Sequence, residues 1–229
     1  MKKIMILSLV FIMPFFKKKD ALGFTIGEEI ANSVSHCVGA LLAITAMVLL
    51  IVKGAAFNRG PLYITSMVIY SFTVMFLFIN STIYHALVPE RAKDVYRRFD
   101  HLSIYLMIAG TYMPFCLISV GGTLGITLCC IQFGLAIIGV VFKSIWVSKL
   151  VVVHTLIFIA MGWMAVFIAK PFMAAIGMAG FILLIAGGIA YTIGTIFYTF
   201  KMFKYHHFIW HIFVIIGAAL HFFCIYLFV

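Results

Sequence analysis

Seven apolar segments follow one another along the chain, and each is about as long as a lipid bilayer is thick. A helix needs roughly 20 apolar residues to cross the hydrocarbon core of a membrane. The segments are continuously apolar and lack the alternation of barrel strands, which favours helices. They are Asn32–Val52, Leu62–His85, His101–Val120, Thr123–Phe142, Leu150–Ala169, Phe172–Tyr198 and His207–Phe228. The sequence predicts an all-α integral membrane protein, a bundle of seven transmembrane helices.

The composition agrees with a membrane-embedded chain. Of its 229 residues, 66% are hydrophobic and 10% are charged, whereas soluble domains carry about 25% charged residues. We expect one membrane domain over residues 28–229, preceded by a cytoplasmic or interfacial segment over residues 1–27. In that segment Ile4–Phe16 is apolar but too short to span comfortably, and lysines flank it. No small-residue cleavage site follows, which favours an interfacial segment over a signal peptide.

The basic residues are divided unequally between the two ends of the predicted helices. Cytoplasmic loops of membrane proteins are enriched in Lys and Arg. With a cytoplasmic amino terminus, three basic residues, Lys53, Arg59 and Lys170, fall outside and thirteen fall inside. The thirteen are Lys2, Lys3, Lys17, Lys18, Lys19, Arg91, Lys93, Arg97, Arg98, Lys143, Lys149, Lys201 and Lys204. The net charge of +10 therefore indicates topology rather than nucleic-acid binding, and the carboxyl terminus is predicted to lie outside.

The small residues of the predicted helices indicate packing rather than chemistry. The five cysteines lie inside apolar segments without the spacing of metal ligands, so we expect them to pack as small apolar residues and to form no disulfide framework. Gly187, Ala190 and Gly194 share one helix face, which favours close approach of a neighbouring helix. Pro114 is expected to kink the third helix.

Ionisable residues gather at the end of the bundle that is predicted to face the cytoplasm. His207 and His211 are four residues apart at the start of the last helix, so both lie on one face. His85 ends the second helix, with Ser81 one turn before it, and Asp100 opens the third. All five side chains are therefore predicted to lie at the same depth.

Three neutral imidazoles that leave one coordination position open suit Zn²⁺. We therefore interpret His85, His207 and His211 as metal ligands. A zinc ion lowers the pKa of a bound water to roughly 7. Asp100 could orient that water or accept its proton, and Ser81 could hydrogen-bond the water or a substrate oxygen.

The other histidines have simpler interpretations. A histidine at a helix end often serves as an interfacial or hydrogen-bonding residue, and we interpret His101 and His206 in this way. His206 is turned about 100° from His207 around the helix axis. His154 and His221 are each interpreted as histidines satisfied within the core.

The first predicted helix also carries polar residues near the same end. Glu29, Asn32 and His36 are three and four residues apart, so they share one helix face. The sequence assigns no role to Glu29 or His36.

The motifs "NSTIYH", "RRFDHLSIYLMIAGTYMPF" and "HHFIWHIFVIIGAALHF" resemble the hemolysin III family, which belongs to the progestin and adiponectin receptor superfamily of seven-helix membrane proteins. "EEIANSVSHCVGA" is similar to the opening of that family, and the resemblance runs from Ile26 to the end of the chain. It implies a zinc ion held by His85, His207 and His211, with Ser81 and Asp100 at the family's serine and aspartate positions. The short loop between the second and third helices suits a bacterial member in the cytoplasmic membrane.

Three functions of different classes follow from this resemblance. The first is a zinc-dependent intramembrane hydrolase that acts on a lipid amide or ester. The second is a non-enzymatic sensor or regulator of membrane homeostasis, with zinc as a structural clamp between helices. The third, a pore-forming cytolysin, is disfavoured because the chain is too apolar for a soluble form and no helix has a polar stripe along its length.

Overall fold

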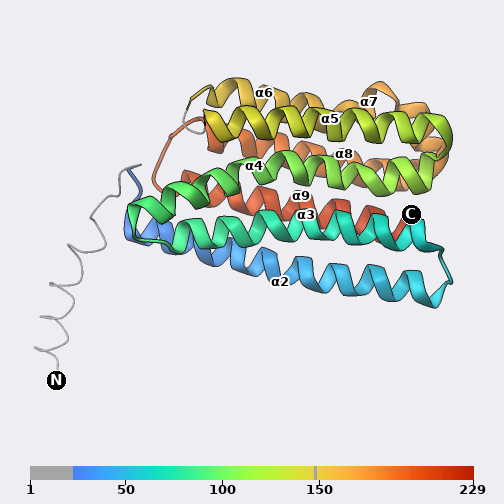
Figure 1. Ribbon diagram of the computed structural model, residues 1–229, viewed down its shortest axis with the longest axis horizontal. Helices are drawn as coiled ribbons and strands as arrows, with labels where there is room; N and C mark the ends of the chain where they lie inside the picture. The colour runs from blue at the N-terminus through green and yellow to red at the C-terminus, as the bar shows by residue number, and fades with distance from the viewer. Residues whose placement is uncertain (1–22, 147–148) are drawn as a thin grey trace, which may run out of the picture.

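The computed structural model describes residues 23–146 and 149–229, and the described chain is helical. The segment Ile4–Phe16, predicted to be interfacial, lies outside the described residues. The helices lie side by side along one axis and run in alternating directions (Figure 1). They are α2 (Ile26–Ala56), α3 (Pro61–Ala86), α4 (Glu90–Pro114), η1 (Phe115–Val120), α5 (Gly122–Ile145), α6 (Val151–Gly162), α7 (Met164–Phe167), α8 (Ala169–Thr199) and α9 (His206–Phe228).

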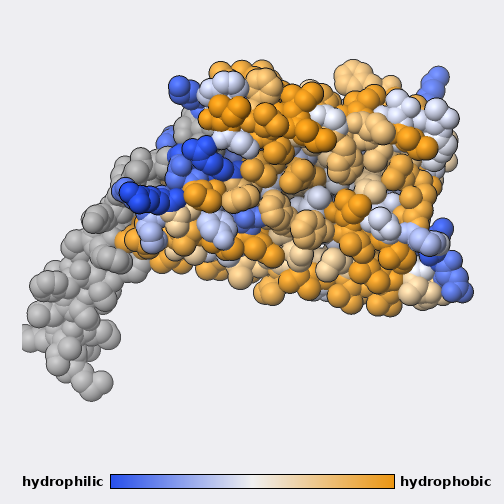
Figure 2. All heavy atoms as spheres, viewed as in Figure 1, coloured by the Kyte–Doolittle hydropathy of each residue, from blue (hydrophilic) through white to orange (hydrophobic). Residues whose placement is uncertain are grey.

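Six helical segments within the described residues are long and apolar enough to cross a membrane. They are Ile26–Ala56, Pro61–Ala86, Glu90–Val120, Gly122–Ile145, Ala169–Thr199 and His206–Phe228. The predicted span Leu150–Ala169 is instead divided at Trp163 into α6 and α7, which follow one another along the bundle (Figure 1). Hydrophobic side chains cover the middle of the face in Figure 2, and hydrophilic ones gather near its ends.

The starts of α2 and α9 are fixed to one another at the same end of the bundle. Thr25 caps α2, and its side chain and backbone are paired with Glu28 in a capping box. The second carboxylate oxygen of Glu28 accepts a hydrogen bond from the backbone N–H of Tyr205, at 3.0 Å. Tyr205 has a left-handed φ of 66° and precedes the first residue of α9. The first and last described spans therefore begin together.

Pro114, where the sequence predicted a kink, ends the regular α-helical pattern of α4. Proline has no backbone N–H to donate to the preceding turn. The chain continues as the π-helix η1, in which Gly121 donates to the carbonyl of Cys116, five residues earlier. A widened turn therefore replaces the α-helical one after the proline.

The predicted stripe of small residues on α8 packs against α9. A side chain at Gly187 would collide with the imidazole of His221, and one at Gly194 would approach Trp210 at 2.7 Å. Close approach of the two helices depends on these glycines. The five cysteines are free, as predicted.

Candidate metal centre

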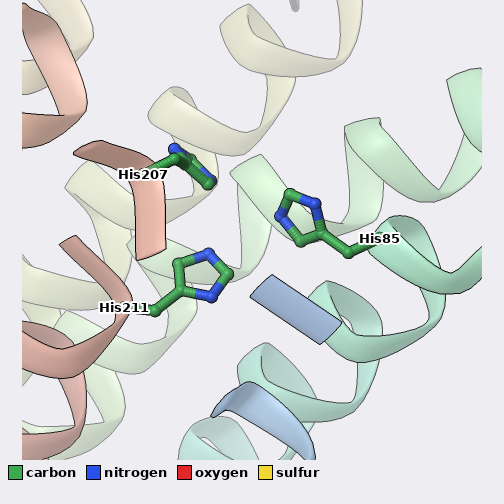
Figure 3. A group of neighbouring side chains, drawn as sticks. All are labelled: His85, His207 and His211. Carbon is green, nitrogen blue, oxygen red and sulfur yellow. The ribbon is translucent and has the colours of Figure 1, made fainter. Parts of the chain in front are cut away.

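Three imidazoles meet at the end of the bundle where α2 and α9 begin. His85 comes from the end of α3, and His207 and His211 come from the first turns of α9. One nitrogen of each ring lies within 4.8 Å of the others, and all three residues are buried. The rings surround a common space (Figure 3). The structure thus brings together the three histidines that the sequence predicted as ligands.

The environment of His85 fixes which of its nitrogens is available. Its Nδ1 is paired with the carboxylate of Glu29, and the other carboxylate oxygen of Glu29 is paired with the ammonium of Lys93. Because a carboxylate only accepts, Nδ1 carries the proton in the neutral ring. The Nε2 lone pair is then directed away from Glu29, and among the described residues this buried atom has no hydrogen-bond partner.

His211 is held in the same way by the backbone of α2. Its Nδ1 lies 3.1 Å from the carbonyl oxygen of Asn32 and 3.0 Å from Oγ of Ser35. The Ser35 hydroxyl itself donates to the Asn32 carbonyl at 2.8 Å, so both oxygens can accept from Nδ1–H. The Nε2 lone pair of His211 is therefore available as well.

One face of α2 supports the imidazoles. Glu29, Asn32 and His36 lie on it, as their spacing indicated. The ring of His36 stacks on His211 with centroids 3.5 Å apart and planes 8° apart, and its other neighbour is Phe78. Sequence analysis left Glu29 and His36 without a role, and the shared face was the only available signal.

These donors fit a metal ion. Metal-binding histidines usually donate their second ring N–H to a carboxylate or backbone carbonyl, which fixes the ring and makes the ligand more basic. His85 and His211 both do so, while their Nε2 atoms remain available. Three imidazoles with one further position open are a catalytic zinc arrangement. The buried, unpartnered Nε2 of His85 supports this fit most directly, because burying an unused acceptor costs about 1–3 kcal/mol.

A cavity of about 90 Å³ is lined by two of the three imidazoles, those of His207 and His211. Its polar end is lined by His207, His211, His36, Ser81 and Asp100, so the two predicted catalytic residues face the same space as two predicted ligands. A single water needs about 10–15 Å³, so there is room for several. The roles of Ser81 and Asp100 remain predictions.

The rest of the cavity is mainly apolar and extends far into the bundle. Its walls include Met107, Phe115, Phe158 and Val214, and it reaches His221. His207 and His221 are fourteen residues apart on α9, which corresponds to about 21 Å at 1.5 Å per residue. The shape suits an elongated apolar molecule with a polar group at the histidine end.

His206 is buried at the start of α9 and forms a hydrogen bond to the backbone. Its exposed fraction is 6%, and its Nδ1 lies 2.8 Å from the carbonyl oxygen of Phe197 near the end of α8. This contact agrees with a hydrogen-bonding role for His206, and the ring of Phe24 lies beside it, with centroids 5.9 Å apart. Its position at a membrane interface stays a prediction. His101 is half-buried, with Nε2 at 3.9 Å from Oδ2 of Asp100.

His154 and His221 are buried, as expected, but only one nitrogen of each ring has a hydrogen-bond partner in the described chain. Nδ1 of His154 lies 2.6 Å from the Tyr105 hydroxyl, and Nε2 of His221 lies 3.0 Å from the Leu184 carbonyl. Their remaining nitrogens are buried without a partner among the described residues. They are not part of the group that could hold a metal.

Comparison with known proteins identifies the family of this chain. Residues 24–222 match the family model described as "Haemolysin-III related". The chain belongs to the hemolysin III family. A "Hemolysin-3 homolog" from Bacillus subtilis (strain 168) is 44% identical over 203 residues, which cover 88% of this chain and 94% of that protein. "Hemolysin-3" from Bacillus cereus is 38% identical over 202 residues, covering 88% and 92%.

A more distant relative comes from animals. "Monocyte to macrophage differentiation factor" from Homo sapiens is 25% identical over 164 residues, which cover 69% of this chain and 68% of that protein. With its apolar helical spans, this hemolysin III family member is an integral, multi-pass membrane protein.

Proposed function

We propose that this hemolysin III family member is a zinc-dependent intramembrane hydrolase that cleaves a lipid amide or ester. The observation that carries the proposal is a long cavity lined by His207 and His211, two members of the group of three imidazoles. That cavity is polar beside the imidazoles, where Ser81 and Asp100 lie, and apolar beyond them. A lipid would place its carbonyl group at the polar end and its hydrocarbon chain in the apolar part.

His85, His207 and His211 would hold the ion, with the Glu29 carboxylate and the Asn32 carbonyl fixing two of the rings. Imidazole suits several transition metals, and three imidazoles with an open position favour zinc among them. Bound zinc would act as a Lewis acid toward the substrate carbonyl and make the attacking water more acidic.

The chain's own residues then handle protons and orientation. Asp100 accepts the proton of the attacking water as that oxygen adds to the carbonyl carbon, and it returns the proton to the leaving nitrogen or oxygen. Ser81 donates a hydrogen bond to the substrate oxygen. The apolar walls hold the hydrocarbon chain and exclude bulk water, which strengthens these electrostatic interactions.

We also propose that α6 and α7 together form a fifth, broken crossing, which makes seven in all. Residues 151–167 would extend about 25 Å as a helix, near the lower limit for a span. With seven crossings, the unequal distribution of basic residues places the amino terminus in the cytoplasm and the carboxyl terminus outside. The metal centre then lies toward the cytoplasmic face of a bacterial cytoplasmic membrane.

Metal content is the first test. We expect purified protein to hold about one zinc per chain, and His85→Ala or His207→Ala to lose most of it, as measured by inductively coupled plasma mass spectrometry. His154→Ala is the matched control, because it removes a buried imidazole outside the group. Unchanged metal content in both ligand variants would contradict the proposed site.

Turnover is the second test. Purified protein would be incubated with ceramides, other N-acyl amides and lipid esters, and released fatty acid would be measured by mass spectrometry. We expect Asp100→Asn to retain zinc and to lose activity by about 10²–10⁴-fold, the usual contribution of a general base. Stoichiometric zinc without turnover of any lipid would argue against a hydrolase.

A second candidate is a membrane-homeostasis sensor with structural zinc. It is favoured by the fact that the imidazoles join α3 to α9, which are far apart in the sequence. In that case His85→Ala would lose stability and signalling together, whereas Asp100→Asn would behave almost normally. Cytolysis, which the relatives' names suggest, requires a third outcome: release of dye from liposomes at a rate that does not depend on zinc.

A further inference from the structure

Lys143 is a buried lysine that the proposed site does not yet use. It lies in the last turn of α5, its exposed fraction is 0%, and its ammonium nitrogen has no hydrogen-bond partner among the described residues. The sequence counted it among the basic residues of the cytoplasmic side, but the structure places it inside the bundle. An ammonium group is costly to bury unless an opposite charge compensates it.

The register of α4 against α5 shows what faces this lysine. The two helices run antiparallel (Figure 1) and are connected at two points. The guanidinium of Arg98 donates to the carbonyl oxygen of Ser144 at 2.6 Å, and the ring of Tyr105 fills the space beside Gly139. Because the helices are antiparallel, Lys143, which precedes Ser144, lies opposite Phe99 and Asp100, which follow Arg98. Lys143 therefore faces the turn that carries Asp100.

The charges around Lys143 agree with this register. Asp100 on α4 attracts it, while Arg97 on α4 repels it. On α6, His154 lies close enough to be affected by the charge of Lys143. Nδ1 of His154 forms a hydrogen bond with the Tyr105 hydroxyl. Asp100 is thus the carboxylate whose charge acts on Lys143, although the ammonium donates no hydrogen bond to it.

Asp100 is placed between this lysine and the cavity. Its exposed fraction is 7%, and it lines the cavity together with Ser81. The other titratable groups near it are His101, at 3.9 Å from Oδ2, and Tyr198 on α8. One side of the carboxyl group faces the cavity, and the positive charge of Lys143 acts from the direction of α5.

We propose that Lys143 is a positioning residue: it pairs with Asp100 across the α4–α5 contact and keeps that side chain a carboxylate directed at the cavity. Its catalytic consequence rests on the proposed hydrolase, because a base must be unprotonated to accept a proton. The pair itself does not depend on any activity. A lysine with no direct contact to the proposed metal ligands would thereby influence whether Asp100 is unprotonated and able to act as a base.

The pair can be tested by infrared spectroscopy, with no need for a substrate. At neutral pH we expect Lys143→Met to show a stronger carbonyl band of a protonated carboxylic acid than wild type. The increase should be absent in the Lys143→Met/Asp100→Asn double variant and in Lys143→Arg. Lys53→Met is the matched control, because Lys53 is a partly buried lysine at the opposite end of the bundle, where it donates to the carbonyl of Tyr226.

The outcomes separate this pair from the hydrolase proposal. If Lys143→Met is folded and its carboxylic acid band is no stronger than that of wild type, the pairing is wrong. If Lys143→Met fails to fold, thermal unfolding of Asp100→Asn with and without Lys143→Met decides: pairing requires that the second substitution restore stability, and no restoration overturns it.

Kinetics test the catalytic consequence. If a lipid is turned over, Lys143→Met should lower kcat by at least about tenfold at neutral pH and move the acid limb of the pH profile to higher pH. Lys143→Arg should restore both. An unchanged pH profile in Lys143→Met would contradict the catalytic role of Lys143. If wild-type protein turns over no lipid, the hydrolase proposal fails, and the infrared experiment alone tests the pairing of Lys143 with Asp100.

Discussion

His211 and His221 lie on the same helix, ten residues apart, and are held in similar ways. A backbone carbonyl accepts from each ring, at 3.1 Å from Nδ1 of His211 and at 3.0 Å from Nε2 of His221. Around His211, α2, α3 and α9 bring three further imidazoles, whereas His221 is packed against Gly187 and the ring of Tyr191. A hydrogen bond that fixes the ring is therefore not enough to make a histidine a candidate metal ligand. What distinguishes His211 from His221 is that three helices bring further imidazoles to it.

The largest effect should come from removing the two rings in turn. We expect His211→Ala to lose most of the bound metal, because two imidazoles cannot replace three at a buried site. His221→Ala should retain full metal content and change only stability. Elemental analysis of both purified variants tests this comparison. Equal losses of metal would contradict the claim that His211 is a metal ligand and His221 is not.

The next effect concerns the residues that orient the ligands. Glu29→Gln removes the carboxylate charge from His85, and such outer partners typically contribute 10- to 100-fold in metal affinity. Competition with a chelator measures this. Glu90→Gln is the control, because Glu90 is an exposed carboxylate in the first turn of α4 and is not part of the group that could hold a metal. If both variants bind metal like wild type, Glu29 does not support the ligand.

The packing around His221 gives a smaller and purely structural effect. A methyl group at position 187 would collide with the His221 ring, so Gly187→Ala should destabilise the protein by about 1–2 kcal/mol despite better helix propensity. Gly188→Ala meets its nearest atom at 3.9 Å and should be neutral or slightly stabilising. Thermal unfolding compares the two, and metal content should stay constant in both.

The smallest effect is expected at Ser35. Ser35→Ala removes one acceptor from Nδ1 of His211 and leaves the Asn32 carbonyl in place. A neutral hydrogen bond contributes about 0.5–1.5 kcal/mol, so metal affinity should fall only a few-fold. Ser33→Ala is the control, since Ser33 donates to the carbonyl of Thr82 instead. A loss as large as that of His211→Ala would contradict this account of the ring's support.

Most of the membrane-spanning helices could be predicted because each of them is a long run of apolar residues in the sequence. The same method missed the first eleven residues of α4, since Glu90–Asp100 is a charged helical segment outside any apolar run. The break at Trp163 has no proline or polar signal. Grouping by depth found His85, His207 and His211, but Lys143 looked like an ordinary cytoplasmic lysine. Only the register of α4 against α5 shows that it faces inward.

The contact between Glu28 and the start of α9 has a consequence for biosynthesis. The two imidazoles of α9 belong to the last described span, so they leave the ribosome after every other part of the site. A nascent chain that ends before residue 206 contains one of the three proposed ligands, His85, however well its earlier helices have inserted. If the three imidazoles hold a metal as proposed, loading requires α9 and reports that this helix lies against α2.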